Sequence, residues 1–372
     1  MSSPFPHISG KRVFVTGHTG FKGAWLIKWL RKLNATVCGF ALPPYTTPSH
    51  FEVGEVQNDL AQNIFGDLRD LSLLSKSIDE FHPDLIMHLG AQSIVSRGYS
   101  DPIETFSTNV MGTANVLESV RLANRPCAIL CVTSDKCYEN VEQVWGYRET
   151  DSLGEKDPYG GSKGAAELVI RSYRNSYFPL DKIDDHGVWL ASARAGNVIG
   201  GGDWTLDALI VDVVKALSEN QTIHLRRPGA TRPWQHVLQC LSGYLEISNQ
   251  LLANNRVACD SWNIGPLPGN EWSVENVVEK FIAFWGTGSW DCPADAQRMK
   301  EASILRLAID KAIWELGWSP LWDVETSIEK TVDWFKSFLA DPTTINDTTL
   351  AQMDEYEQLL LDRKEDQVDS IV

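Results

Sequence analysis

A glycine turn that follows a short apolar strand constrains the fold of this chain more than any other feature. The apolar run 13–16 is followed by Gly17, Gly20 and Gly23, with the spacing G-x-x-G-x-x-G. Such a turn at the start of a helix binds a pyrophosphate, because the first backbone amides of the helix point toward it. Gly17 would permit the tight turn, Gly20 the close approach of the phosphates, and Gly23 the packing of helix on strand. The segment therefore predicts a dinucleotide-binding domain.

The first half of the chain alternates apolar, β-branched runs with segments of helical period, which is typical of βαβ units. We expect an α/β protein with a doubly wound, parallel, Rossmann-like sheet and a smaller, discontinuous α+β domain. The predicted strands are 12–16, 36–40, 85–88, 128–133 and 187–193, and the predicted helices are 22–33, 71–81, 103–123 and 159–177. A further strand at 261–264 is expected to rejoin the main sheet.

Net charge and cysteine usage limit the partners and the compartment. The net charge of −16 argues against nucleic acid and anionic membrane as general partners. The seven cysteines form neither a CxxC pair nor a zinc spacing, so no metal site is predicted, and they indicate a reducing compartment. The first ten residues lack the regions of a signal peptide, and no apolar run is long enough for a membrane span. A cytoplasmic protein is expected.

Tyr159 and Lys163 are four residues apart, so they share one face of the predicted helix. There the ammonium can lower the phenol pKa from its ordinary value of about 10, which makes a base for an alcohol proton. Ser134 and Asp135 follow an apolar strand at the carboxyl edge of the sheet, where doubly wound folds bind their ligands. Ser134 could hydrogen-bond a substrate hydroxyl beside Tyr159. Together with the glycine turn, these residues predict nicotinamide-dependent alcohol oxidation.

The nicotinamide cofactor cannot be assigned from local residues alone, because the segment 40–44 has neither the acid typical of NAD enzymes nor the arginine typical of NADP enzymes. Asp67 is a candidate acceptor for the adenine amine. The predicted cofactor contacts are Gly17, Thr19, Gly20, Phe21, Lys22, Gly23, Asp67, Leu68, Ala91, Tyr159 and Lys163.

Over nearly its whole length the chain resembles the nucleotide-sugar 4,6-dehydratases, a group of extended short-chain dehydrogenases/reductases. The matching segments are 17–23, 66–67, 109–113, 134–136, 159–163, 194–197, 232–236 and 316–320. The segments 17–23, 133–138 and 232–236 are particularly similar to the members that act on CDP-glucose. Sister enzymes for dTDP- or GDP-sugars usually have Glu where this chain has Lys136.

The resemblance implies a cofactor, NAD, and a reaction, the loss of water from CDP-D-glucose to give CDP-4-keto-6-deoxy-D-glucose. Tyr159 would take the C4 hydroxyl proton, Ser134 would orient that hydroxyl, and Lys163 would hold the nicotinamide ribose. Asp135 would be the acid that protonates the leaving C6 hydroxyl. Lys136 would remove the C5 proton, or it would stay charged and stabilise the C4 enolate. Both roles stay open, because a lysine of ordinary pKa, about 10.4, is almost entirely charged at pH 7.

The substrate pyrophosphate requires cations despite the acidity of the chain, and Arg232 is the first candidate for a bidentate clamp. The predicted substrate contacts are Ser93, Arg97, Ser134, Asn197, Arg227, Arg232 and Arg306. The resemblance further implies a homodimer in which the helices 103–123 and 159–177 pack across a two-fold axis. The change of sequence pattern after residue 194 predicts an NAD-binding domain (1–196 and 236–265), a nucleotide-sugar-binding domain (197–235 and 266–348) and an acidic tail (349–372). That tail is expected to be solvated or frayed.

Two other classes of function remain possible. A nucleotide-sugar C4-epimerase shares the Tyr/Lys pair and the cofactor, but it needs no acid at C6, so Asp135 followed by Lys136 favours a dehydratase for this or another nucleotide sugar. A non-catalytic nucleotide sensor on the same fold would typically lack Tyr159 or Lys163, and both residues are present.

Overall fold

The central element of the molecule is a seven-stranded parallel sheet. A computed structural model describes residues 3–293 and 304–369 of the 372. The strands are β1 (Arg12–Thr16), β2 (Thr36–Ala41), β3 (Gln62–Phe65), β4 (Leu85–His88), β5 (Cys127–Val132), β6 (Val188–Arg194) and β11 (Ser261–Asn263). Their order is β11-β6-β5-β4-β1-β2-β3, and every neighbouring pair is parallel. The order reverses between β1 and β4, which confirms the predicted doubly wound sheet.

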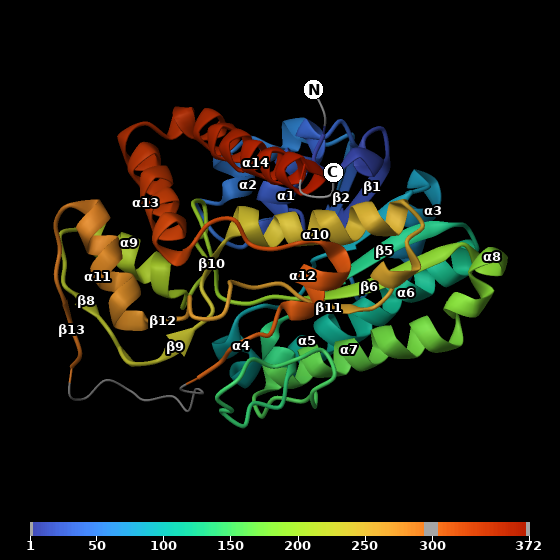
Figure 1. Ribbon diagram of the computed structural model, residues 1–372, viewed down its shortest axis with the longest axis horizontal. Helices are drawn as coiled ribbons and strands as arrows, with labels where there is room; N and C mark the ends of the chain where they lie inside the picture. The colour runs from blue at the N-terminus through green and yellow to red at the C-terminus, as the bar shows by residue number, and fades with distance from the viewer. Residues whose placement is uncertain (1–2, 294–303, 370–372) are drawn as a thin grey trace.

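Helices cover both faces of this sheet (Figure 1). On one face lie α1 (Phe21–Lys32), α10 (Val237–Leu252) and α14 (Ile345–Asp369), and on the other lie α3 (Leu71–Phe81), α6 (Gly112–Ala123) and α7 (Pro158–Ser176). Alternate residues of a strand point to opposite faces. Accordingly, Val13 and Val15 are buried in the core beneath α1 and α10, whereas Phe14 is buried in the core beneath α3 and α6.

The predicted elements of this sheet are largely confirmed. The bounds of β1, β4 and α3 agree with the prediction, and β11 pairs with β6 as expected. The predicted helix 103–123 is instead three consecutive pieces: α5 (Pro102–Phe106), a π-helical turn (Ser107–Met111) and α6. The edge strand β3 was not predicted.

A second region extends from the carboxyl edge of the sheet (left in Figure 1). It contains three two-stranded pairs: β7 (Val198–Ile199) with β10 (Gln235–His236), β8 (Ile223–His224) with β13 (Trp290–Asp291), and β9 (Thr231–Arg232) with β12 (Trp272–Ser273). Its helices include α9 (Leu209–Ser218), α11 (Val274–Trp285) and α13 (Val324–Ala340), whereas α12 (Asp310–Leu316) packs beside β11 and α10 at the main sheet. The shorter helices α2 (His50–Val53), α4 (Val95–Ser100) and α8 (Ile183–His186) lie in connections. The division into two domains stays a prediction.

The predicted solvated tail is wrong, because α14 is packed against the body of the molecule. Met353, Tyr356 and Leu360 are at most 1% exposed. They are spaced three and four residues apart, so they form one apolar stripe on an otherwise acidic helix. The indole of Trp29 donates a hydrogen bond of 2.6 Å to Glu357, which also fixes α14 on α1. Within the described residues, no helix is both long and apolar enough to cross a membrane.

Candidate active site

A large cavity of about 1190 Å³ lies at the carboxyl ends of the parallel strands. Loops that follow β1, β2, β4, β5 and β6 line it, together with the start of α7 and residues 203–208 of the second region. This edge, next to the reversal of strand order, is where doubly wound folds bind ligands.

The glycine turn of this cavity is compact enough to admit a pyrophosphate against its backbone. Gly17 has a φ of +75°, a conformation that favours glycine. A Cβ on Gly23 would lie 2.2 Å from the carbonyl oxygen of Gly17, so helix α1 packs directly on the turn. Gly20 caps α1 and offers no side chain to its first amides. Those amides are therefore available for an anion, and the turn fits a dinucleotide.

All eleven predicted cofactor contacts line the cavity: Gly17, Thr19, Gly20, Phe21, Lys22, Gly23, Asp67, Leu68, Ala91, Tyr159 and Lys163. The carboxylate of Asp67 is bound by the neighbouring Arg69. Arg69 holds this carboxylate through Nε at 3.0 Å and through Nη2 at 2.5 Å, and this guanidinium lowers the pKa of Asp67. The role of Asp67 toward adenine stays a prediction.

The predicted catalytic residues converge from two elements. Ser134 ends the turn after β5, and its hydroxyl accepts a hydrogen bond from the amide of Lys136 at 3.2 Å and donates to Asp135 at 3.0 Å. Tyr159 and Lys163 lie in the first turns of α7, and all five side chains belong to residues that line the cavity. The N-cap of α7 is Asp157, which accepts hydrogen bonds from the amides of Tyr159 and Gly160.

The electrostatics of the Tyr/Lys pair differ from the prediction. Burial raises the pKa of the Tyr159 phenol well above its ordinary value, and the hydrogen bond with Ser134 only partly opposes this. Burial, followed by the nearby charge of Lys22, lowers the pKa of Lys163 to about 8. The pKa of the phenol in the chain by itself is therefore raised, not lowered as predicted, because desolvation by burial dominates.

The carboxylate of Asp135 is buried and held in place on two sides. It is 1% exposed, and its Oδ2 accepts a hydrogen bond of 3.2 Å from Asn197. Asn197 adopts a φ of +50°, which turns its side chain back toward the segment after β5. The backbone of Gly196 closes the other side. The segment after β6 thus fixes the residue predicted to be the acid.

The predicted substrate contacts are only partly brought together. Ser93, Arg97, Ser134, Asn197 and Arg232 line the cavity, and Arg232 is 9% exposed. The guanidinium of Arg97 binds the carboxylate of Glu104 through two hydrogen bonds of 2.7 and 2.8 Å. Two predicted arginines, Arg227 and Arg306, are not among the described residues that line the cavity.

The structure also identifies cavity residues that sequence reasoning missed. Arg226 lines the cavity where Arg227 was predicted, and the backbone oxygen of Val144 binds the guanidinium of Arg306 at 2.7 Å. On the cofactor side, the hydroxyl of Tyr45 donates to Thr205 at 2.9 Å and so joins the loop after β2 to residues 203–208. Tyr45 could have been predicted from its polar side chain in the loop after a strand. No feature of the sequence distinguished Arg226 from its neighbour Arg227.

Comparison with known proteins agrees with this site. The model of the GDP-mannose 4,6 dehydratase family matches residues 14–331. CDP-glucose 4,6-dehydratase from Salmonella typhimurium is 46% identical over 331 residues, which cover 89% of this chain and 92% of that protein. A dTDP-glucose 4,6-dehydratase from Xanthomonas campestris is 25% identical over 343 residues, covering 86% and 92%.

Solved structures share the fold at lower identity. The dTDP-glucose 4,6-dehydratase of Streptomyces venezuelae, solved with NAD bound, gives a TM-score of 0.74 at 24% identity and covers 89% of this chain and 99% of its own. The UDP-glucose 4-epimerase of Thermus thermophilus, also solved with NAD, gives 0.70 at 22% identity and covers 87% and 99%. These two likenesses establish the fold, whereas the family rests on the match over residues 14–331 and on the 46% identity. The chain belongs to the GDP-mannose 4,6 dehydratase family.

Proposed function

We propose that this protein is an NAD-dependent dehydratase that converts CDP-D-glucose to CDP-4-keto-6-deoxy-D-glucose and water. The observation that carries the proposal is the placement of Asp135 and Lys136 beside the Tyr159/Lys163 pair in one cavity. An enzyme that only oxidises an alcohol requires no buried acid such as Asp135 beside the Tyr159/Lys163 pair. The 46% identity to CDP-glucose 4,6-dehydratase of Salmonella typhimurium supports the nucleotide.

NAD is proposed as the cofactor, with its pyrophosphate at the N-terminus of α1 and its nicotinamide near Tyr159. When bound, NAD would supply the hydride acceptor for the oxidation at C4 and the hydride donor for the reduction at C6. The fit of the glycine turn supports this assignment, as does the NAD found in solved structures of the same fold. Lys22 and Lys163 both line the cavity, and their cations are proposed to lie beside the cofactor.

The oxidation step requires a base for the C4 hydroxyl, and Tyr159 is proposed for it. Its phenol is buried, so charge on the oxygen must be stabilised locally. Lys163, with a pKa lowered to about 8, is still mostly protonated at pH 7, and its ammonium can offset the phenolate. Ser134, hydrogen-bonded to the phenol, orients the C4 hydroxyl toward it.

The elimination step removes a proton from C5 and hydroxide from C6. The C4 ketone makes the C5 proton acidic, and Lys136 is proposed to accept that proton. Asp135 is proposed to donate a proton to the C6 hydroxyl, which leaves as water. The hydrogen bond from Asn197 and the contact with Gly196 hold the Asp135 carboxyl in one orientation for this donation.

The diphosphate of the substrate is proposed to bind Arg232, with Arg226 nearby, since both line the cavity and belong to the second region. Ser93, Arg97 and Asn197 remain proposed contacts of the sugar and its phosphates. The C4-epimerase is the rival activity, because solved epimerases share this fold.

A homodimer in the cytoplasm is proposed for the working enzyme. Helices α5, α6 and α7 and the π-helical turn pack together. Large apolar side chains are exposed along them: Ile103 at 78%, Phe106 at 41%, Met111 at 55%, Leu122 at 56% and Leu168 at 46%. Such a face supports association across a two-fold axis. All seven cysteines are free, which supports a reducing compartment.

One experiment tests the activity and the substrate together. The purified protein is incubated with NAD and with CDP-, dTDP-, UDP- or GDP-glucose in heavy water, and products are identified by NMR. We expect a 4-keto-6-deoxy sugar that carries deuterium at C5, formed fastest from CDP-glucose. A C4-epimer that retains its C6 hydroxyl would establish the epimerase instead, and no water loss from any substrate would refute the dehydratase.

The control is Tyr159→Phe, which removes only the phenolic oxygen. We expect turnover to fall by about 10⁴-fold, because general base catalysis is worth up to that factor. NAD and CDP-glucose should still bind, as measured by calorimetry. Full activity of this variant would refute the proposed base.

A further inference from the structure

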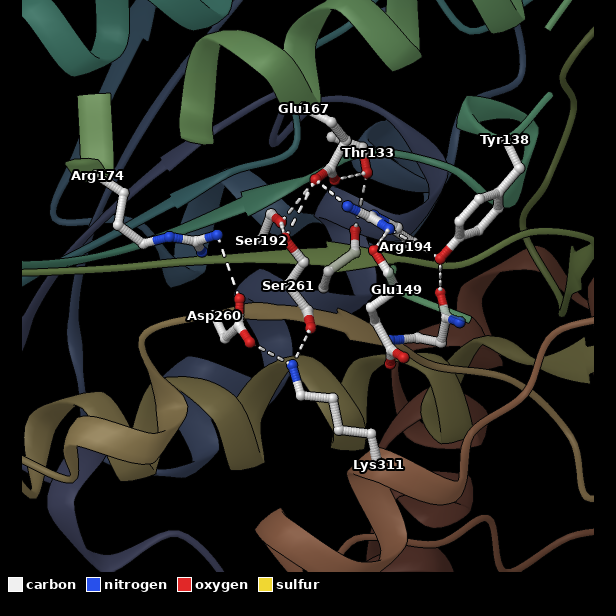
Figure 2. A network of polar contacts seen from close by, with 12 residues as sticks. Thr133, Tyr138, Glu149, Glu167, Arg174, Ser192, Arg194, Asp260, Ser261 and Lys311 are labelled. Carbon is white, nitrogen blue, oxygen red and sulfur yellow. Dashed lines mark hydrogen bonds and ion pairs between the residues drawn. The ribbon is translucent and has the colours of Figure 1, made fainter. Parts of the chain in front are cut away.

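A buried ion pair lies directly behind the candidate active site. Glu167 is on α7, one turn after Lys163, and Arg194 is the last residue of β6. Nη2 of Arg194 lies 2.8 Å from Oε2 of Glu167, and the two side chains are 4% and 1% exposed. Figure 2 shows this pair between the helix and the sheet.

The carboxylate of Glu167 also accepts hydrogen bonds from hydroxyls on or directly after three neighbouring strands. It accepts hydrogen bonds from Thr133 after β5 at 2.5 Å, from Ser192 in β6 at 2.9 Å and from Ser261 in β11 at 3.4 Å. Burial disfavours this carboxylate, but Arg194 and the hydroxyl donors outweigh burial and lower the pKa of Glu167. The helix that carries Tyr159 is therefore tied to the strand end that precedes Ser134.

The guanidinium of Arg194 extends the network to the far end of the catalytic segment 134–136. Its Nη1 donates to the hydroxyl of Tyr138 at 2.9 Å and to the backbone oxygen of Glu149 at 3.0 Å. Tyr138 in turn donates to Asn263 of β11 at 2.7 Å. Thr133 and Tyr138 flank the catalytic segment, so the pair holds it from both sides (Figure 2).

The pair is also directly linked along the chain to the segment that contacts Asp135. Arg194 is followed within three residues by Gly196 and Asn197, which close around the Asp135 carboxylate. Three elements of the site thus meet at one buried pair: α7 with Tyr159 and Lys163, the segment 134–136, and the segment 195–197. Apolar residues often replace a buried ion pair without loss of stability, so stability alone does not explain it.

We propose that Glu167 and Arg194 are positioning residues that keep the Tyr159/Lys163 helix in register with Ser134, Asp135 and Lys136. The proposal rests on the proposed dehydratase function, because it assigns the pair to the geometry of that reaction. Neither residue is among the described residues that line the cavity, so neither acts on the sugar or the cofactor directly.

The test compares variants of the pair with a matched ion pair elsewhere on the same helix. Arg174 lies two turns further along α7 and pairs with the half-exposed Asp260 at 3.2 Å, at the opposite end of the same polar network from Tyr138 (Figure 2). Glu167→Gln removes the charge behind the site, and Arg174→Gln removes the control pair. For each protein, kcat and KM for CDP-glucose and the melting temperature are measured.

We expect Glu167→Gln to lower kcat by about 100-fold with KM changed by less than about threefold, because small displacements of reacting groups cost that much. Arg174→Gln should lose melting temperature without losing kcat. If Glu167→Gln keeps kcat within twofold of the wild type, or if both variants lose kcat in proportion to melting temperature, the pair is only structural and the proposal fails.

A second pair of variants applies even if Glu167→Gln does not fold. Thr133→Val removes one hydrogen bond to Glu167 at nearly constant shape, and Thr133→Ser restores it. We expect kcat to fall about tenfold in the valine variant, as for a lost hydrogen bond to a charged group, and to recover in the serine variant. Equal kcat in all three proteins would overturn the proposal. An inactive wild type would instead refute the dehydratase, so the two failures are distinct.

Discussion

The carboxylate of Asp135 lies so close to Gly196 that a Cβ at position 196 would be 2.0 Å from both carboxylate oxygens. No real side chain tolerates that distance. Because Asp135 is buried and cannot turn into solvent, any residue other than glycine must push its carboxylate out of place. The segment after β6 therefore determines where the proposed acid lies.

From this contact we predict that Gly196→Ala lowers kcat by about 100-fold, the effect of displacing a catalytic group by about 1 Å. Water loss from CDP-glucose is the assay. Gly265→Ala is the control, because Gly265 lies just after β11, is not among the described residues that line the cavity, and a Cβ there would meet no atom closer than 3.5 Å. The control should keep far more activity; an active Gly196→Ala would show that the carboxylate position does not matter.

The role of Lys136 can be decided by comparing two substitutions. Lys136→Arg keeps a positive charge that cannot be removed at any working pH, whereas Lys136→Met removes the charge and the nitrogen. A base requires a neutral amine, so we expect both variants to lose exchange of the C5 proton with heavy water by about 100-fold or more. Recovery of exchange in the arginine variant alone would instead assign Lys136 to the enolate.

Lys163 should make the folded protein less stable. Burial lowers its pKa from 10.5 to about 8, which corresponds to about 3 kcal/mol against the charged form. Between pH 8 and 10.5 the unfolded chain keeps this proton and the folded chain does not. The unfolding free energy therefore rises with pH in this window, and the cost is fully present below about pH 8.

Lys163→Met should accordingly raise the unfolding free energy at pH 7 by up to about 3 kcal/mol while it abolishes activity. The gain should shrink as the pH approaches 10.5. Lys28→Met is the matched control, because Lys28 is also buried but binds Asp59 at 3.1 Å and Asn346 at 2.6 Å. That control should destabilise the protein; if both variants destabilise it equally at pH 7, the cost assigned to Lys163 does not exist.

Much of the fold could be predicted because its strands are buried on both faces and form continuous apolar runs, as in β1, β4 and β5. The edge strand β3 escaped prediction because Gln62–Phe65 is polar and only partly buried. Helix α14 was misjudged because its many acids conceal the stripe of Met353, Tyr356 and Leu360.

The candidate site was predictable where a motif fixes local geometry, as in the glycine turn and the Tyr159/Lys163 spacing. It was not predictable where tertiary contacts decide. Arg226 and Arg227 are neighbours in the chain, yet of the two only Arg226 is among the described residues that line the cavity, and the sequence does not distinguish them. The raised pKa of Tyr159 reflects burial, which a spacing of four residues does not reveal.

The proposed dimer can be tested at Ile103, which is 78% exposed on α5 in the apolar face shared with α6 and α7. We expect the wild type to have twice the chain mass by light scattering and Ile103→Lys to be largely monomeric. Because the two-fold axis relates the two subunits, each substitution occurs twice in the interface. The loss of both buried Ile103 side chains weakens association by about 1000-fold. Trp314→Lys is the control, because Trp314 is 85% exposed on α12, away from that face. A monomeric wild type, or an Ile103→Lys variant as dimeric as the control, would place the interface elsewhere or remove it.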